Sequence, residues 1–281
     1  MASVRDIRRR IRSVRNMQQI TKAMKMVAAS KLRKAQDKVI AARPYARQLQ
    51  EVLARLAQAQ VDINHPLLQE RPVEKIGYVI VTSDRGLCGG YNANLIRMTN
   101  TLIAEEAHEV KLVTVGRKGR DFYRRGKLEI LAEFVGLSDN PSYGQAKEIA
   151  QEVISLYESG ELDEVYIVYN EFISAISQRP TKVKLLPIDK PEQVSNREYI
   201  FEPSPEEILT TLLPKYVETQ VFRTLLEGKA SEMGAKMTAM GAATDNAKEL
   251  IDRLTLQMNR ARQAAITTEI SEIVGGASAL E

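Results

Sequence analysis

The chain has 281 residues, 44% of them hydrophobic, so it can bury a sizeable core and form one large or two ordinary domains. Aromatic residues reach only 5% and tryptophan is absent, which suits long helices, and the single cysteine, Cys88, excludes an intramolecular disulfide or a cysteine-based metal cluster and favours a reducing compartment. With 40 basic and 36 acidic residues the chain is nearly neutral overall, and no apolar run approaches the roughly 20 residues that span a bilayer, so membrane association would require partners.

Positive charge is concentrated in residues 1–50. Asp6 and Asp37 are the only acidic residues there, against a long series of Lys and Arg. Such an asymmetry predicts an acidic partner. The pattern continues far past the length of a transit peptide, so we interpret it as part of the mature protein.

The N-terminal segment has the apolar spacing of a long helix. Apolar side chains recur every three or four residues and form the expected seam: Val4, Ile7, Ile11, Val14, Met17, Ile20, Met24 and Val27. Ala-rich helical sequence continues to about Gln60, which at 1.5 Å per residue predicts a length of roughly 80 Å. Pro44 is expected to kink this helix or to start a second one.

Residues 74–205 alternate between strand-like and helical segments. The expected strands are 77–81, 110–115, 128–135, 164–172 and 181–188. The expected helices are 92–107, 120–126 and 144–160. This alternation predicts a single Rossmann-like α/β domain with a mostly parallel sheet.

A glycine-rich turn, TSDRGLCGGYNANL at 82–95, follows the first expected strand. Strand, glycine-rich turn and helix is the order of a phosphate-binding loop. However, Gly86, Gly89 and Gly90 fit neither the P-loop nor the dinucleotide spacing, and no lysine follows them. The turn is therefore a poor match to a nucleotide site.

A second long helix is predicted from Ser204, a suitable N-cap before Pro205, to nearly the end of the chain. Pro214 is a possible kink. The expected seam of its later part is Leu250, Leu254, Met258, Ala261 and Ala265. Small side chains gather earlier in the helix, which suggests close approach by another helix or a tight sleeve: Gly228, Ala230, Gly234, Gly241, Ala242 and Ala243.

Neither long helix can bury its seam alone. The predicted architecture is therefore an α/β fold in which terminal helices, residues 1–60 and 206–281, form a long antiparallel coiled coil. The α/β domain, residues 74–205, is inserted between them.

Three segments carry a resemblance to a known family. ITKAMKMVAASKLRKAQ at 20–36, SDRGLCGGYN at 83–92 and ITTEISEIVGGASA at 266–279 are similar to the hallmark segments of the gamma subunit of F-type ATP synthases, in particular the bacterial type. The similarity covers the whole chain in the same order.

The resemblance implies a mechanical function. The coiled coil would rotate inside a ring of α and β subunits and bias each catalytic site between conformations, because a partner shifts an equilibrium only through differential interaction energy. The α/β domain would rest with the epsilon subunit on the membrane c-ring, at the cytoplasmic face of the bacterial cell membrane. The resemblance implies a non-catalytic subunit with no cofactor, metal, nucleic acid or small-molecule ligand, and a purely structural role for the glycine-rich turn.

The resemblance also implies four partner contacts. Arg262 and Gln263 match positions that hydrogen-bond a β-subunit loop, and Met24 and Lys25 match positions that face the β subunit's acidic lever. Gly241 stands where a polar or charged residue is expected, which puts specific contacts at that level in doubt.

Two other interpretations remain open at this point. The basic first fifty residues are compatible with a nucleic-acid-binding coiled coil, although no aromatic platform or known reading motif accompanies them. The glycine-rich turn is compatible with a nucleotide-dependent α/β enzyme, although it lacks the lysine and paired acids.

His65 and His108 have no ligand-spaced companions, so we predict that both lie at the surface, and Cys88 is predicted to be an inert, small side chain.

Overall fold

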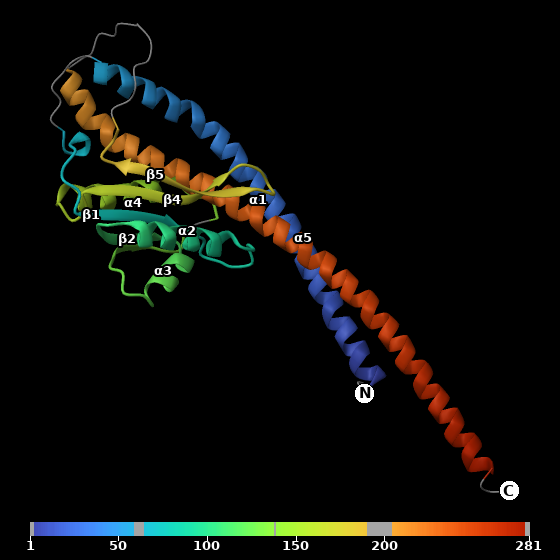
Figure 1. Ribbon diagram of the computed structural model, residues 1–281. Coiled ribbons are helices and arrows are strands. Elements are labelled where there is room, and N and C mark those ends of the chain that lie inside the picture. Colours follow the sequence, from blue (N-terminus) through green and yellow to red (C-terminus); the bar gives the residue numbers. More distant parts are fainter. Residues whose placement is uncertain (1–2, 59–64, 138, 190–203, 279–281) are drawn as a thin grey trace. The chain divides into compact units, whose positions relative to one another are not determined.

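The computed structural model describes residues 3–58, 65–137, 139–189 and 204–278 (Figure 1). Two long helices, α1 (Val4–Gln58) and α5 (Pro205–Ser278), flank all the other elements in sequence. Between them come the strands β1 (Lys75–Val81), β2 (Glu109–Val115), β3 (Ile130–Phe134), β4 (Glu164–Phe172) and β5 (Gln178–Leu186). The remaining helices are η1 (Pro66–Leu68), α2 (Tyr91–Glu105), α3 (Arg117–Tyr123) and α4 (Tyr143–Glu158).

The chain divides into two compact units. One consists of Met1–Val27 and Met237–Glu281, and the other of Ala28–Lys236. The predicted division into 1–60, 74–205 and 206–281 follows sequence segments instead and stays a prediction. Residues 1–2, 59–60 and 279–281, where some of its limits fall, lie outside the described residues.

The larger unit contains the predicted α/β sheet. The strand order is β3-β2-β1-β4-β5, with parallel pairing except between β4 and β5, which form a hairpin. All five expected strands are present, and the mostly parallel α/β fold is confirmed. Helix α3 begins three residues earlier than predicted, because the chain turns at Gly116, which has a φ of 96°.

Side chains of β1 alternate between two cores. Val79 and Val81 pack with α4, with the first part of α5 and with Leu49 and Leu53 of α1. Tyr78 and Ile80 pack on the other face with α2 and α3. The sheet is thus buried on both faces, which explains why its central strands are almost continuously apolar.

The smaller unit is an antiparallel pair of helix ends. Ile7 and Ile11 of α1 are buried against Leu254 of α5, and the hydroxyl of Thr244 donates to that of Thr21 at 2.8 Å. Early residues of α1 thus lie beside late residues of α5. The predicted coiled coil is confirmed in this unit.

The predicted seam of α1 is partly wrong. Met17, Ile20 and Val27 are 58%, 60% and 54% exposed, while Gln18, Thr21 and Ala28 face inward. The inward positions keep the three-and-four spacing, but Gln18 and Thr21 are polar. The apolar pattern therefore predicted their neighbours, Met17 and Ile20, in the seam.

The predicted seam of α5 needs two changes. Leu254, Met258 and Ala261 pack as predicted, but Leu250 is 38% exposed and Ile251 takes its place. Ala265 is exposed and lies beyond Ala261, the last residue of α5 in the packed cluster.

Neither internal proline ends its helix. Helix α1 is continuous across Pro44, and α5 is continuous across Pro214. Pro44 is exposed and so is Ile40, one turn earlier, so water can satisfy the carbonyl that loses its donor.

The start of α5 is as predicted, since the Ser204 hydroxyl accepts the backbone N–H of Glu207.

The antiparallel pairing predicts a specific crosslink. In a Cys88→Ala background, Thr21→Cys and Thr244→Cys place two thiols where the hydroxyls now touch, so mild oxidation is expected to form the disulfide in most molecules. The measurement is a gel shift under non-reducing conditions. Met17→Cys with Thr244→Cys is the control, because Met17 points to solvent. Equal oxidation of both pairs would contradict the pairing.

Candidate functional site

The last part of α5, residues 262–275, is exposed along its whole length, and we call it the bare segment. Every residue from 262 to 275 is exposed, including Ile266, Ile270, Ile273 and Val274. A solitary helix of this kind gains no tertiary packing, which is the main source of helix stability in proteins. Exposed apolar side chains along it therefore indicate a surface suited to binding a partner.

The predicted contact residues fall in two separate places. Arg262 and Gln263 are exposed at the start of the bare segment, just past Ala261, the last α5 residue in the packed seam. Met24 is half-buried and Lys25 is exposed, and they lie beside the part of α5 near Gly241. About 21 residues of helix separate Gly241 from Arg262, or roughly 30 Å. The structure does not bring the two pairs together.

Gly241 of α5 lies beside Lys25 of α1. It is buried, and a Cβ built on it would lie 3.5 Å from Nζ of Lys25. The end of the Lys25 side chain thus lies over α5 at Gly241, at a distance that a methyl group would also tolerate. Lys25 is exposed, so its charge lies at the surface at the level of Gly241.

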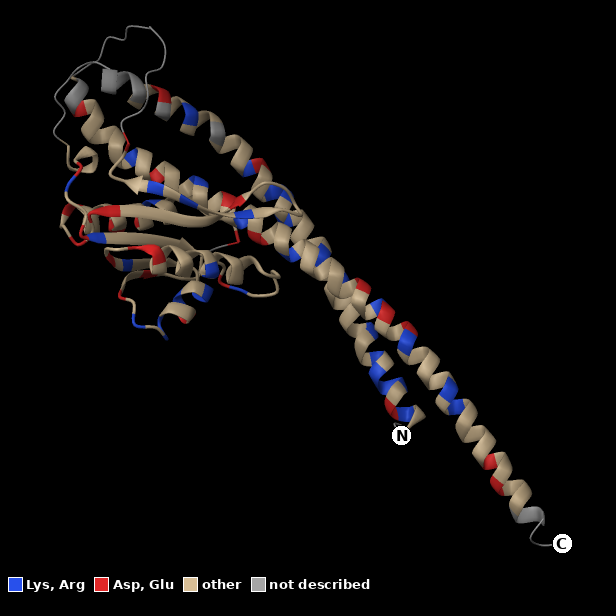
Figure 2. Cartoon of the chain, viewed as in Figure 1, with Lys and Arg blue, Asp and Glu red and all other residues tan. Residues whose placement is uncertain are grey.

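Positive charge follows the first turns of α1 (Figure 2). Arg5, Arg8, Arg9, Arg10 and Arg12 are exposed or half-buried there. Helices α1 and α5 together expose cations and apolar side chains on one unit, which suits a proteinaceous partner with acidic and apolar surfaces.

The glycine-rich turn connects β1 to α2. Gly89 has a φ of 57°, in the left-handed region that favours glycine, whereas Gly90 has a φ of −80° and serves as the N-cap of α2. Leu87 was missed by the sequence analysis: its φ is 64° and its side chain is 62% exposed. An apolar, exposed side chain in a strained conformation is typical of a contact surface.

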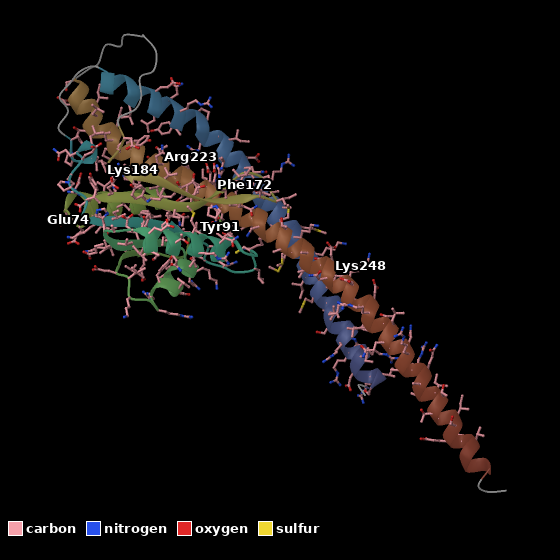
Figure 3. The ribbon with its side chains drawn as sticks, viewed as in Figure 1. Glu74, Tyr91, Phe172, Lys184, Arg223 and Lys248 are labelled. Carbon is pink, nitrogen blue, oxygen red and sulfur yellow. The ribbon has the colours of Figure 1, made fainter. Side chains whose placement is uncertain are left out.

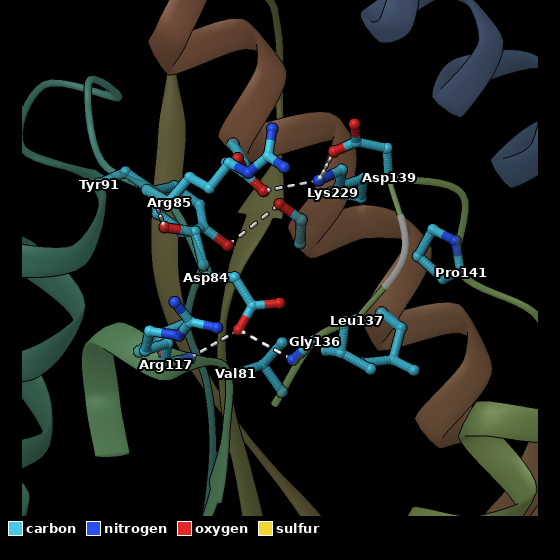
Figure 4. Close-up of a pocket in the computed structure, with 15 residues that line it drawn as sticks. Val81, Asp84, Arg85, Tyr91, Arg117, Gly136, Leu137, Asp139, Pro141 and Lys229 are labelled. Atoms are coloured by element: carbon cyan, nitrogen blue, oxygen red, sulfur yellow. Dashed lines mark hydrogen bonds and ion pairs between the residues drawn. The ribbon is translucent and has the colours of Figure 1, made fainter. Parts of the chain in front are cut away.

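A cleft of about 380 Å³ opens at the carboxyl ends of β1, β2 and β3 (Figure 4). This edge of a parallel sheet is where α/β proteins commonly bind ligands. Here a carboxylate of the chain itself accepts hydrogen bonds from two backbone N–H groups at this edge. Oδ1 of Asp84 accepts the backbone N–H of Arg117 at 2.9 Å and that of Gly136 at 3.2 Å.

Asp84 makes this edge of the sheet a poor match to a phosphate site. Its carboxylate already pairs with two backbone N–H groups there and would repel a phosphate beside it. We expect calorimetry of the full chain with ATP or NAD to show no binding at micromolar concentrations. A saturable one-to-one isotherm that Gly89→Val abolished would contradict this expectation and restore the enzyme interpretation.

Ion pairs line the other side of the cleft. Asp139 lies 3.0 Å from Nζ of Lys229 and 2.5 Å from Nζ of Lys31, so it joins the segment after β3 to both α5 and α1. Hydrogen bonds from Lys31 and Lys229 hold the pKa of Asp139 well below its usual range. Glu232 is buried between Lys229 and Lys236, at 3.0 and 2.9 Å. These charges are mutually paired and leave little to attract a ligand.

Two side chains of the region, those of Cys88 and Tyr91, pack rather than react. Cys88 is 2% exposed, and burial raises the pKa of its thiol, which fits the predicted inert role. Tyr91, labelled in Figure 3, donates its hydroxyl to the carbonyl of Gly228 at 3.0 Å. Helix α5 packs directly against this ring at Gly228, where a built Cβ would stand 3.4 Å from the hydroxyl, an ordinary van der Waals distance. The small residues of α5 predicted a close approach by another helix or a sleeve, and at Gly228 the neighbour is Tyr91 of α2 in the α/β domain.

The two histidines differ. His108 is exposed, as predicted, but His65 is half-buried and its Nδ1 accepts the backbone N–H of Leu67 at the start of η1. Across the described ranges, no group of three His, Cys, Asp or Glu side chains is arranged to hold a metal ion. None of the helices in those ranges is long and apolar enough to cross a membrane.

Comparison with known proteins shows a full-length relationship. Residues 3–280 match the family model described as ATP synthase. The chain is 87% identical over 281 residues to the ATP synthase gamma chain of Desulfitobacterium hafniense and 59% identical over 290 residues to that of Heliobacterium modesticaldum. Each match covers 100% of both proteins.

Solved structures agree with the fold. The central stalk and c-ring structure of the mitochondrial ATP synthase of Tetrahymena thermophila contains a chain with 28% identity and a TM-score of 0.63, covering 80% of this chain and 99% of that one. A chain of the Euglena gracilis mitochondrial ATP synthase, solved with OSCP, F1 and c-ring, gives a TM-score of 0.69 at 20% identity. That match covers 99% of this chain and 94% of the other.

Proposed function

Because this chain belongs to the family of ATP synthase gamma subunits, we propose that it is the non-catalytic central shaft of a proton-translocating F-type ATP synthase. Its rotation would couple the membrane ring to the catalytic sites of its partners. The matches to gamma chains and to a central stalk support this role and give no support to the nucleic-acid alternative.

One observation carries the proposal: the bare end of α5. Residues 262–275 extend past the last paired residue of α5 and expose Ile266, Ile270 and Ile273. A helix that makes no contact with its own chain is free to contact a surrounding ring. On this proposal residues 1–60 and 206–281 form the shaft and residues 74–205 form the globular domain.

The proposed partners follow from the membership of the chain in the ATP synthase gamma family. The shaft would sit inside the hexamer of α and β subunits, with the cations of α1 facing acidic loops. The globular domain would contact the epsilon subunit and the c-ring. These partners would hold the chain as a peripheral protein at the cytoplasmic face of the bacterial cell membrane.

Four residues are proposed to contact the β subunit. Lys25 presents a cation at the level of Gly241, and Met24 lies next to it on the half-buried side of α1. Arg262 and Gln263 present hydrogen-bonding groups about 30 Å further along α5. The partner would then contact the shaft at two positions along its length, about 30 Å apart.

Reconstitution tests the proposal. Purified full chain mixed with α and β subunits is expected to elute with them as one complex, and the complex should hydrolyse ATP. The matched control is a chain ending at Arg260, which lacks the bare segment and should associate more weakly. If the full chain eluted apart from α and β subunits under every salt condition, the proposed role would be wrong.

A further inference from the structure

A second cavity, of about 640 Å³, lies within the larger unit between α1, α4 and α5. Its walls are mainly apolar: Val39, Ala42 and Ala46 of α1, Tyr143 of α4, and Phe222 and Leu226 of α5. Ala42 and Ala46 are one turn apart, so their short side chains leave the space that larger residues would fill. The volume is in the range of sites that bind drug-sized molecules.

The aromatic wall is held rigidly. The rings of Tyr143 and Phe222 meet edge to face, with centroids 5.6 Å apart and an interplanar angle of 72°. The Tyr143 hydroxyl donates to Oε2 of the buried Glu218 at 2.6 Å, which fixes the ring from behind. Tyr45, 54% exposed, stands at the mouth of the cavity. An aromatic ligand could continue this edge-to-face arrangement without reorganisation.

The rim is cationic. Arg47, Lys215 and Arg223 all line the cavity, and Figure 3 labels Arg223 on α5. Nε of Arg223 lies 2.9 Å from Oε1 of the buried Glu227, so its charge is offset. Arg47 and Lys215 are exposed and form no ion pair with any described residue. Two cations that are not directly paired with a carboxylate thus flank the cavity, while the carboxylate of Glu218 is engaged by the hydroxyl of Tyr143.

We propose that this cavity binds a small aromatic anion, a planar ring system bearing one carboxylate or sulfonate. The rings would enter between Ala42, Tyr143 and Phe222, where apolar burial favours them. The acidic group would remain at the rim and accept hydrogen bonds from Arg47 and Lys215. A bound ligand would bridge α1 and α5, and its occupancy would stiffen their pairing at this level.

The test uses two dyes that differ by one group. The anionic probe is 8-anilinonaphthalene-1-sulfonate, and N-phenyl-1-naphthylamine has the same rings without the sulfonate. With the full chain, fluorescence titration should give one anionic probe per molecule. Arg47→Glu with Lys215→Glu should weaken the anionic probe about tenfold or more and leave the neutral dye nearly unchanged. Ala42→Phe should displace both dyes.

The control is Arg33→Glu with Lys34→Glu, which removes two exposed cations of α1 outside the cavity and should leave both affinities unchanged. Circular dichroism checks that each variant remains folded. Equal anionic-probe affinity in Arg47→Glu with Lys215→Glu, or binding that survives Ala42→Phe, would overturn the proposal. If a Glu- and Leu-rich amphipathic peptide bound here and neither dye did, the occupant would be a protein segment and the proposal would also be wrong.

Discussion

Replacing Gly116 with alanine is expected to destabilise the α/β domain by about 3 to 5 kcal/mol. Gly116 has a φ of 96° and ψ of 142°, a conformation that is essentially restricted to glycine. A Cβ there would lie 2.2 Å from the carbonyl oxygen of Thr82, so the backbone after β1 would have to move. All ten tyrosines lie between residues 45 and 216, so the urea midpoint measured by tyrosine fluorescence reports on the larger unit.

Gly160→Ala is the matched control. Gly160 also has a positive φ, 77°, but a Cβ built on it would meet nothing within 4 Å. Only the backbone conformation opposes the substitution, at a cost of about 1 kcal/mol. If Gly116→Ala were no more destabilising than Gly160→Ala, the close packing of the turn after β2 against the turn after β1 would be wrong.

Replacing both Arg262 and Gln263 with alanine is expected to lower ATP turnover of the reassembled complex by about tenfold or more. A charge-assisted hydrogen bond from arginine contributes about 1.5 to 3 kcal/mol when it is partly desolvated. Adjacent residues point about 100° apart around a helix, so both can contact one subunit only if that subunit wraps part of α5. Because both side chains are exposed, the isolated chain should keep its circular dichroism and melting temperature.

Arg253→Ala is a suitable control, since Arg253 is an exposed cation of α5 within its paired part. It should lower turnover less than the double substitution does. Full turnover by an assembled Arg262→Ala, Gln263→Ala complex would show that this pair is merely solvated and that coupling depends on other contacts.

Local sequence rules predicted the elements of this fold well. Strand alternation, the Ser204 N-cap and the N-terminal periodicity each depend on neighbours within a few residues, and each is present. The inward face of α1 was harder to predict. Thr21 faces inward because its hydroxyl pairs with Thr244, more than two hundred residues away, so the apolar Ile20 was chosen instead.

The candidate site was less accessible to sequence analysis. The glycine spacing predicts that the turn after β1 is a poor phosphate site, and this stays a prediction. The pairing of Asp84 with backbone groups that follow β2 and β3 joins segments far apart in the chain, so no local sequence pattern indicated it. The bare end of α5 depends on where α1 begins in space, and sequence periodicity alone cannot align two helices. The four predicted partner contacts involve groups on other subunits, so they stay predictions.

Single-molecule rotation tests the central claim most directly. Cys88 is buried, so Lys127→Cys, at an exposed position between α3 and β3, provides a selective attachment point for a bead on the globular domain. With the α and β subunits fixed to a surface, the account predicts that ATP drives stepwise rotation of the bead in one direction. Undiminished ATP hydrolysis with a stationary, securely attached bead would contradict the account, because this chain would then not turn with the catalytic cycle.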